Sequence, residues 1–466
     1  MVPLEYEGAP RRGERDEGGY SVARASMILT AECVGTGVLA LPGCAHTLGL
    51  IPFFALLGFQ VGLNGYAGML LAQAAQICER RASYNLCHET TTPLHDDVDE
   101  ASAWGGADEA EAALDAVVFG AEAAPVAVER PRDFLDLAHK LDAGPRTKRI
   151  VGFCWYGNLI LITAQYLVVM ARALRAALPI EGCAVLASLL ASCAAVVVLS
   201  RLPTLDAIGR GAAQISFLAV VLILGACVRE TANTLPNAWP AVALDGGGVA
   251  ALAAAAGSVT FSMTSTKLLL NVRLEMAQPD EARSALGGGL AAYTTLYALV
   301  ALLAGRDPPP FLLDALPRGS SRARAAAVLL FAHVAVSYSI NQQVLARTLE
   351  RRFGGGRRFA LSVALTAASL LLALALPIFA DLVSLIGSLT TGPLTFAIPA
   401  LCYAAATRDA PRRRVGVAFL VALTIVLTAS GTAGAGAEIV GHWRMQTRAA
   451  PGVRGFLCDA QAAAGS

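Results

Sequence analysis

Long apolar stretches separated by polar segments dominate the hydrophobic pattern of this chain. Eleven of these stretches reach the length of about 20 residues that an α-helix needs to cross a bilayer. They cover residues 25–47, 50–78, 150–171, 182–200, 209–228, 247–271, 286–304, 325–346, 359–380, 382–406 and 415–434. The pattern therefore predicts an all-α, polytopic membrane protein with about eleven transmembrane helices.

The polar segments divide the chain around these helices. We expect a cytoplasmic N-tail, helices one and two, a cytoplasmic insertion, helices three to eleven and a polar C-tail, at residues 1–24, 25–78, 79–148, 149–434 and 435–466. Lys and Arg are more frequent on the side of the N-terminus, which places that side in the cytoplasm. The middle of the insertion is acidic and has no hydrophobic pattern, which predicts disorder.

Composition supports a membrane protein and narrows its chemistry. The chain has 466 residues, of which 55% are hydrophobic and 15% charged, whereas soluble domains carry about 25% charged residues. The net charge of +1 gives no reason to expect a nucleic-acid partner. We find no metal-ligand motif, no phosphate-binding loop and no hydrolase motif, so we expect no cofactor, no metal and no enzyme activity.

The first and sixth apolar stretches contain residues that interrupt helices. The first holds Gly35-Thr36-Gly37 and then Pro42-Gly43, and the sixth holds Gly257-Ser258 followed by hydroxyl-rich residues 262–266. Broken backbone inside a bilayer is tolerated only where it faces protein or a water-filled cavity. Close packing of helices is the alternative explanation for the glycines.

The two interruptions occupy matching positions if stretches one to five and six to ten form two halves. Paired interruptions of this kind are the best sequence indication of a transporter's binding site. The start of a half-helix offers N–H groups to a carboxylate, and the carbonyl groups at the other break suit an ammonium group. An amino acid zwitterion matches both, and the pairing therefore favours an amino acid site.

Four motifs resemble the amino acid/auxin permease family, within the amino acid–polyamine–organocation superfamily. They are Ala31–Pro42 in the first stretch, Glu275–Pro279 after the sixth, Ser337–Ile340 in the eighth, and Leu376–Tyr403, which includes Asp381–Ser388. The resemblance implies a 5+5 inverted-repeat fold with an added eleventh helix and with helices one and six broken. It also implies substrate binding between these two helices and coupling to H⁺ or Na⁺.

The resemblance also assigns the site residues. By position, Gly35, Thr36 and Gly37 would bind the substrate carboxylate through their N–H groups. Substrate-binding residues in the other motifs would be Phe261, Ser262 and Thr264 around the amino group and side chain, and Ser337 and Ser339 across the cavity.

Two departures from the family pattern limit what it implies. Ala31 stands where sodium-coupled members often have Asn, and this favours H⁺ over Na⁺ as the coupling ion. Ser265 and Thr266 replace a Gly-His pair of many relatives, so a mechanism that uses that histidine does not transfer to this chain.

Glu32 and Lys267 are charged residues within apolar stretches. A charge at a helix centre costs roughly 2.5–3.5 kcal/mol on insertion scales, so such residues usually face a cavity or a partner. Our hypothesis is that Glu32 carries the coupled proton and that Lys267 is its counter-ion or mimics a bound cation. The alternatives are a hydrogen-bond acceptor that never titrates for Glu32 and snorkelling to the cytoplasmic surface for Lys267. His333 is either a packing residue or a proton relay.

The sequence thus predicts a secondary active symporter that moves amino acids across a membrane, with H⁺ as the coupling ion. The alternative function is an amino acid sensor that binds without productive transport, for which the acidic insertion is the only support. The expected partners are an amino acid substrate and the lipid bilayer, and protein partners are unknown. Both the plasma membrane and a vacuolar or lysosomal membrane fit the sequence.

Overall fold

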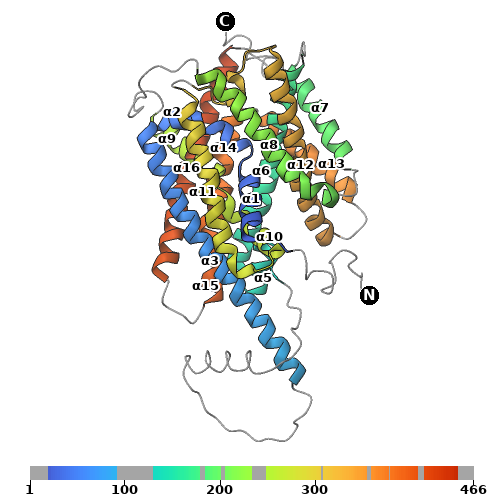
Figure 1. Cartoon of the computed structure of the whole chain (residues 1–466), viewed down its shortest axis with the longest axis vertical. Coiled ribbons are helices and arrows are strands. Elements are labelled where there is room, and N and C mark those ends of the chain that lie inside the picture. The colour runs from blue at the N-terminus through green and yellow to red at the C-terminus, as the bar shows by residue number, and fades with distance from the viewer. Residues whose placement is uncertain are drawn as a thin grey trace, which may run out of the picture.

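The chain folds into a bundle of helices (Figure 1). The computed structural model describes residues 19–91, 130–178, 184–200, 205–232, 248–305, 308–353, 358–376, 378–407 and 414–449. Within these ranges we find no strand, and the only β-type pairing is an isolated bridge between Tyr20 and Met276. The predicted all-α class is confirmed.

The first half of the bundle begins with a helix in two pieces. Its elements are α1 (Val22–Cys33), η1 (Thr36–Ala40), α2 (Leu41–Leu48), α3 (Leu50–Thr91), α5 (Phe134–Lys140), α6 (Pro145–Ala177), α7 (Ala184–Leu199) and α8 (Leu205–Ala232). The second half also begins with a helix in two pieces. Its elements are α9 (Gly248–Ser262), α10 (Ser265–Glu275), η3 (Pro279–Glu281), α11 (Ala282–Leu303), η4 (Leu312–Ala315), α12 (Ser321–Phe353), α13 (Arg358–Ala375), α14 (Phe379–Ile386), η5 (Gly387–Thr391), η6 (Pro393–Ala397), α15 (Ile398–Ala406) and α16 (Arg414–Ala449).

A helix occupies each of the eleven predicted stretches. By length and apolarity, the described residues contain eight helices able to cross a membrane, and a ninth if the bent pair of α1 and α2 counts as one span. The helix α7 is apolar but shorter, with 16 residues. The multi-pass membrane architecture is therefore confirmed, and the total of eleven spans stays a prediction.

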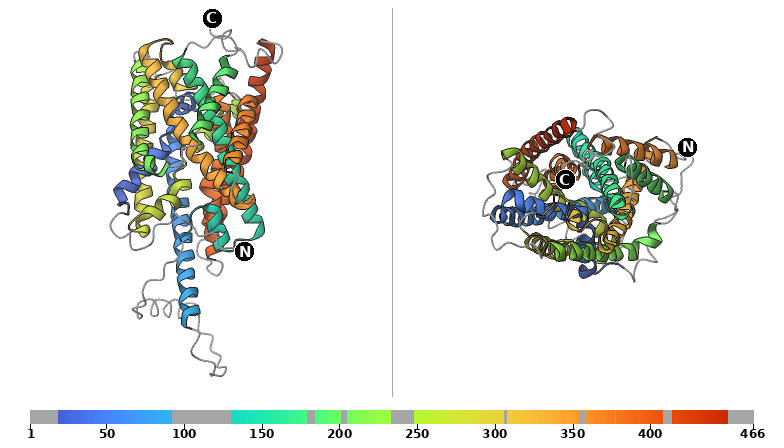
Figure 2. Two further views of the ribbon diagram at one scale, coloured as in Figure 1. Left: turned by 90° about the vertical axis from the view of Figure 1, so that its right-hand side faces the viewer. Right: turned by 90° about the horizontal axis from the view of Figure 1, so that it is seen from above.

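The ends of two helices differ from the sequence expectation. The helix α3 extends to Thr91 rather than ending near residue 78, and its last part projects from one end of the bundle (Figure 2). Charged residues such as Glu79 and Arg80 are good helix formers, so the polar sequence continues the helix into the predicted insertion. The helix α5 and the start of α6 occupy its other end, and the middle of the insertion lies outside the described residues. Similarly, α16 continues to Ala449 in the predicted C-tail.

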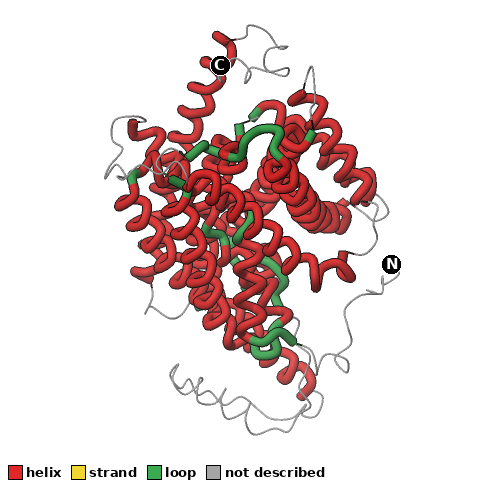
Figure 3. The backbone as a smooth tube through the Cα atoms, turned by 45° about the horizontal axis from the view of Figure 1, so that its top comes forward, coloured by secondary structure: helices red, strands yellow, loops and turns green. Residues whose placement is uncertain are grey.

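Both predicted interruptions are present, and each falls at a defined place. The first lies between Cys33 and Thr36, and α1 and the η1–α2 segment meet at an angle of 49°. Pro42 lies in the first turn of α2, where a missing N–H group is tolerated. The second lies at Met263 and Thr264, between α9 and α10. Figure 3 shows loop segments between helices inside the bundle.

The glycine at position 257 does not interrupt the sixth helix, because it lies inside α9. A Cβ atom at Gly387 would overlap the backbone carbonyl of Gly257, and a Cβ atom at Gly257 would lie 2.8 Å from the carbonyl oxygen of Ser384. These glycines therefore let α9 and η5 approach backbone to backbone, as small residues do in membrane helix packing. For Gly257 the packing explanation holds.

Candidate functional site

The first break exposes backbone N–H groups at the start of a short helix. The helix α1 ends at Cys33, and the N–H of Gly35 donates a 2.8 Å hydrogen bond to the Cys33 carbonyl. Because η1 begins at Thr36, the N–H groups of Thr36 and Gly37 have no partner within that helix. In this conformation Thr36 and Gly37 therefore offer their N–H groups, whereas Gly35 uses its own locally.

The second break exposes carbonyl groups at the end of α9. Met263 still donates to the Val259 carbonyl at 3.2 Å, but the chain leaves the helix at that residue. Thr264 occupies the cap position of α10, and the N–H of Lys267 donates to its carbonyl at 3.1 Å. The carbonyl of Ser262 consequently has no partner within a helix, as is usual for the last turn of an α-helix.

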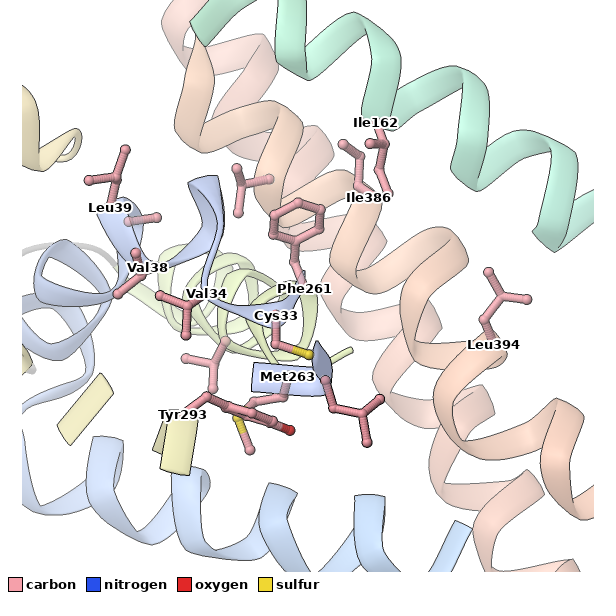
Figure 4. Close-up of a cluster of buried hydrophobic side chains, with 14 of the residues drawn as sticks. Cys33, Val34, Val38, Leu39, Ile162, Phe261, Met263, Tyr293, Ile386 and Leu394 are labelled. Carbon is pink, nitrogen blue, oxygen red and sulfur yellow. The ribbon is translucent and has the colours of Figure 1, made fainter. Parts of the chain in front are cut away.

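The two breaks pack directly against each other. A Cβ atom at Gly37 would lie 2.7 Å from the hydroxyl oxygen of Ser262 and 3.2 Å from the ring of Phe261, so only glycine permits this approach. Figure 4 shows Cys33, Phe261 and Met263 in one buried cluster with Tyr293. The structure thus brings together the first-helix and sixth-helix residues that the sequence analysis assigned to one site.

A tyrosine on α11 contacts both breaks. The buried hydroxyl of Tyr297 donates to the carbonyl of Cys33 at 2.6 Å and to the carbonyl of Ser262 at 3.1 Å. One helical turn earlier, the hydroxyl of Tyr293 lies 2.9 Å from that of Ser265, in the first turn of α10. The helix α11 therefore holds α1, α9 and α10 at the ends that meet in the site.

The side chains of the predicted site are already engaged within the protein. Gln165 on α6 donates to the Thr36 hydroxyl at 3.0 Å, and the Ser262 hydroxyl donates to the Ser258 carbonyl at 3.1 Å. The backbone groups of Thr36 and Ser262 are therefore better placed than their hydroxyl groups to contact a ligand.

The predicted residues of α12 take up different positions. The Ser339 hydroxyl donates to the Ala335 carbonyl at 2.8 Å, within its own helix. The α12 side chain that approaches the first break is His333, whose Nε2 would lie 3.9 Å from a Cβ atom at Gly35. Ser337 is half-buried and lies one turn after His333, so the two share a face of α12, whereas Ser339 lies about 200° from Ser337 around the axis.

The two intramembrane charges lie near the site but do not pair directly. Lys267 donates a 2.7 Å hydrogen bond to the side-chain oxygen of Asn158 on α6. Within the described residues, Glu32 and Lys267 form no salt bridge within 4.0 Å, although they are close enough to interact electrostatically. The Glu32 side chain is exposed in the last turn of α1.

Asn158 extends this network to the tenth predicted span. Its amide group donates to the hydroxyl oxygens of Thr390 and Thr391, each at 3.0 Å. Both threonines belong to η5, which, like η6, is a π-helix, a form that is frequent at functional sites. This segment lies inside the longest family motif, 376–403.

The sequence analysis missed Asn158, Gln165 and Tyr297 as site residues. Asn158 and Gln165 are amides seven residues apart within an apolar stretch, which places them on one face of α6. That spacing is a usable signal for a polar face directed into the bundle. Tyr297 gave no such signal, because an aromatic residue in a membrane helix most often only packs.

Comparison with known proteins agrees with this arrangement. The family model described as transmembrane amino acid transporter protein matches residues 18–92 and 121–441, which include both broken helices and the π-helical segments. None of the curated proteins that were compared with the chain matches it. Since the family match covers most of the chain, the protein belongs to the transmembrane amino acid transporter family and is an integral membrane protein whose substrate is an amino acid.

Proposed function

We propose that the protein is a secondary active symporter that takes amino acids across its membrane together with H⁺. The observation that carries the proposal is the contact between the two breaks, where Gly37 lies against Ser262. It brings the N–H groups at the start of η1 and the helix-end carbonyls of Cys33 and Ser262 to one place within the bundle, and an amino acid needs both donors and acceptors.

In the proposed complex, the carboxylate accepts hydrogen bonds from the N–H groups of Thr36 and Gly37. These groups begin η1, and the start of a helix favours an anion. The ammonium group donates to the carbonyls of Cys33 and Ser262, which end α1 and α9 and favour a cation. The ring of Phe261 would border the substrate side chain.

Glu32 is the proposed proton carrier. It follows Ala31, which stands where sodium-coupled family members often have Asn, and it is the second-last residue of α1. Protonation removes the negative charge of Glu32 and weakens its attraction to Lys267, whose ammonium group is hydrogen-bonded to Asn158. A proton taken up by the exposed Glu32 carboxylate would thereby alter the electrostatic field at the end of α1, where the substrate would bind.

The matching positions of the two breaks support the 5+5 inverted repeat. Each half of the chain would begin with a broken helix, and alternating access would come from one helix bundle rocking against the rest. The tenth span, with its two π-helical segments, would then be the counterpart of the fifth.

Reconstitution into liposomes tests the proposal directly. The full-length protein is assayed for uptake of a ¹⁴C-labelled mixture of L-amino acids with an imposed H⁺ gradient, an imposed Na⁺ gradient or neither. We expect accumulation with the H⁺ gradient alone and its loss in Glu32→Gln. Glu275→Gln, which alters an exposed carboxylate at the end of α10, serves as the control and should retain uptake.

The same assay separates transport from sensing. Binding of the labelled mixture without accumulation under either gradient would favour a sensor over a symporter. Accumulation driven by Na⁺, or unchanged H⁺-driven uptake in Glu32→Gln, would refute proton coupling through Glu32. Whether the protein acts in the plasma membrane or in a vacuolar or lysosomal membrane is a separate question, which localisation of a tagged chain answers.

A further inference from the structure

The hydroxyl of Tyr297 occupies the acceptors that a substrate ammonium group would use. It donates to the carbonyl oxygens of Cys33 and Ser262 at 2.6 and 3.1 Å. Cys33 is the last residue of α1 and Ser262 the last residue of α9. Tyr297 itself is fully buried, so water does not compete for these contacts.

The tyrosine hydroxyl satisfies this pair of carbonyls only in part, and the Cys33 carbonyl accepts a second hydrogen bond, at 2.8 Å, from the Gly35 N–H. The tyrosine hydroxyl has one proton, and two acceptors must share it. The ends of two helices meet here, and each end carries partial negative charge on its last carbonyl groups. An ammonium group has three donors and a full positive charge, and charge-assisted hydrogen bonds are stronger than neutral ones. The acceptors therefore match an ammonium group better than a phenol.

We propose that Tyr297 is a latch that the substrate ammonium group displaces from the carbonyls of Cys33 and Ser262. The inference rests on the proposed binding site between the two breaks. In this structure, Tyr297 joins the ends of α1 and α9 to α11. Binding of an amino acid transfers these carbonyls to the substrate and releases both helix ends from the Tyr297 hydroxyl.

The neighbouring Tyr293 limits the proposed release to the ends of α1 and α9. Its hydroxyl contacts the side chain of Ser265 on α10, and its ring centroid lies 5.3 Å from that of Tyr297. Tyr293 touches no carbonyl of the proposed ammonium site, so substrate does not compete with it. Release of Tyr297 would free the ends of α1 and α9 at the breaks from this contact with α11. The helix α10 stays attached through Tyr293, and the start of α1 stays attached through the 2.9 Å hydrogen bond from the Ser26 hydroxyl to the Ala285 carbonyl. The latch thus links recognition of the amino group to movement of two half-helices.

If the Tyr297 hydroxyl competes with the substrate for these carbonyls, its removal should strengthen substrate binding. Equilibrium binding of a ¹⁴C-labelled mixture of L-amino acids is measured on the purified full-length protein, on Tyr297→Phe and on Tyr293→Phe. Loss of one competing hydrogen bond should lower the half-saturating concentration of Tyr297→Phe by roughly three- to tenfold. Tyr293→Phe removes no competitor for the two carbonyls and should not lower the half-saturating concentration. A Tyr297→Phe variant that binds equally or more weakly would show a scaffolding residue and would overturn the latch.

The unmodified protein provides the separate test of the proposed function. If it does not bind the mixture, the amino acid site itself fails, and the latch fails with it. If it binds, the ratio between variants decides the latch alone.

A second measurement covers the case in which Tyr297→Phe does not fold. The protein is prepared with 3-fluorotyrosine at position 297 or at position 293, which keeps both hydroxyl groups. Addition of the unlabelled amino acid mixture should shift the ¹⁹F signal from position 297 more than that from position 293, whose ring lies 5.3 Å away. An unchanged signal at position 297 on saturation with amino acids would overturn the proposal.

Discussion

The ammonium group of Lys267 donates a 2.7 Å hydrogen bond to the amide oxygen of Asn158 and thereby joins α10 to α6. The amide group of Asn158 in turn donates hydrogen bonds to Thr390 and Thr391 of η5. One buried charge therefore ties together three helical segments that come from distant parts of the sequence. This contact also decides against simple snorkelling of Lys267, because its charged end is held by α6 inside the bundle.

Substitution of Lys267 by methionine removes the charge and keeps the length of the side chain. We expect uptake to fall by about tenfold or more, since even roughly 1.4 kcal/mol lost from a rate-limiting step has that effect. The amount of folded protein should change little, because the cost of the unpaired Asn158 oxygen is offset by no longer burying a charge. Uptake in liposomes and size-exclusion chromatography check the two parts. Normal uptake in Lys267→Met would leave Lys267 with a packing role only.

Arg273 and Glu79 form a second buried connection, between α10 and α3. The guanidinium group contacts both carboxylate oxygens, and its second nitrogen donates at 3.0 Å. Arg273 is only 2% exposed, so removal of its partner leaves a buried charge. We expect Glu79→Gln to destabilise the protein by about 3–5 kcal/mol. The double variant Glu79→Leu/Arg273→Met should recover most of that loss, as measured by thermal unfolding in detergent. Equal stability of Glu79→Gln and the unmodified protein would contradict this account.

The approach of α9 to η5 depends on glycine. Gly387→Ala would place a methyl group on the backbone carbonyl of Gly257, which cannot move aside as a flexible side chain can. Overpacking of this kind costs about 1–3 kcal/mol and often more where backbone is involved. Thermal unfolding of Gly387→Ala should therefore occur at a lower temperature. Gly287→Ala on α11 is the matched control, because no atom lies within 4 Å of its added methyl group. A control that loses as much stability would refute the explanation.

The lengths of the apolar stretches were sufficient to predict a multi-pass helical membrane protein, because the bilayer requires apolar helices and helices occupy every apolar stretch. The presence of a break in the first helix was predictable, since Gly35 and Gly37 stand within an apolar stretch. The exact limits of the breaks were not predictable, since Gly257 has the same local signature and serves packing instead. In that case the neighbour, Gly387, is more than a hundred residues away, and only the fold reveals the contact.

The site was predictable in part for the same reason. The backbone groups of Thr36, Gly37 and Ser262 follow from the local breaks, and Gly37 packs against Ser262. The hydrogen-bond partners of the polar side chains come from distant parts of the chain and cannot be predicted from the neighbouring sequence. Asp381, for example, belongs to a family motif, but its contact at 3.0 Å with the ring of His442 joins α14 to α16 and could not be read from either segment.

The N-terminal segment before α1 is held to the segment after α10 by backbone hydrogen bonds. The N–H of Tyr20 donates to the Glu275 carbonyl at 2.7 Å, and the N–H of Ala277 donates to the Tyr20 carbonyl at 3.1 Å. Gly19 permits this contact, since a Cβ atom there would lie 2.6 Å from the backbone of Ala277. We therefore expect Gly19→Val to open the pairing and to speed hydrogen exchange at the Tyr20 and Ala277 amides.

Each of these backbone bonds contributes only about 0.5–1.5 kcal/mol net, so their loss should free the ends of α1 and α10 without unfolding the bundle. Mass spectrometry of exchanged peptides measures the effect, with protection of α11 as the internal reference. Ser21→Ala is the matched control, because it removes only the side-chain cap of α1, a 3.4 Å contact from the Arg24 amide. Unchanged exchange in Gly19→Val, or an equal increase in Ser21→Ala, would mean that the pairing does not hold these two half-helices together.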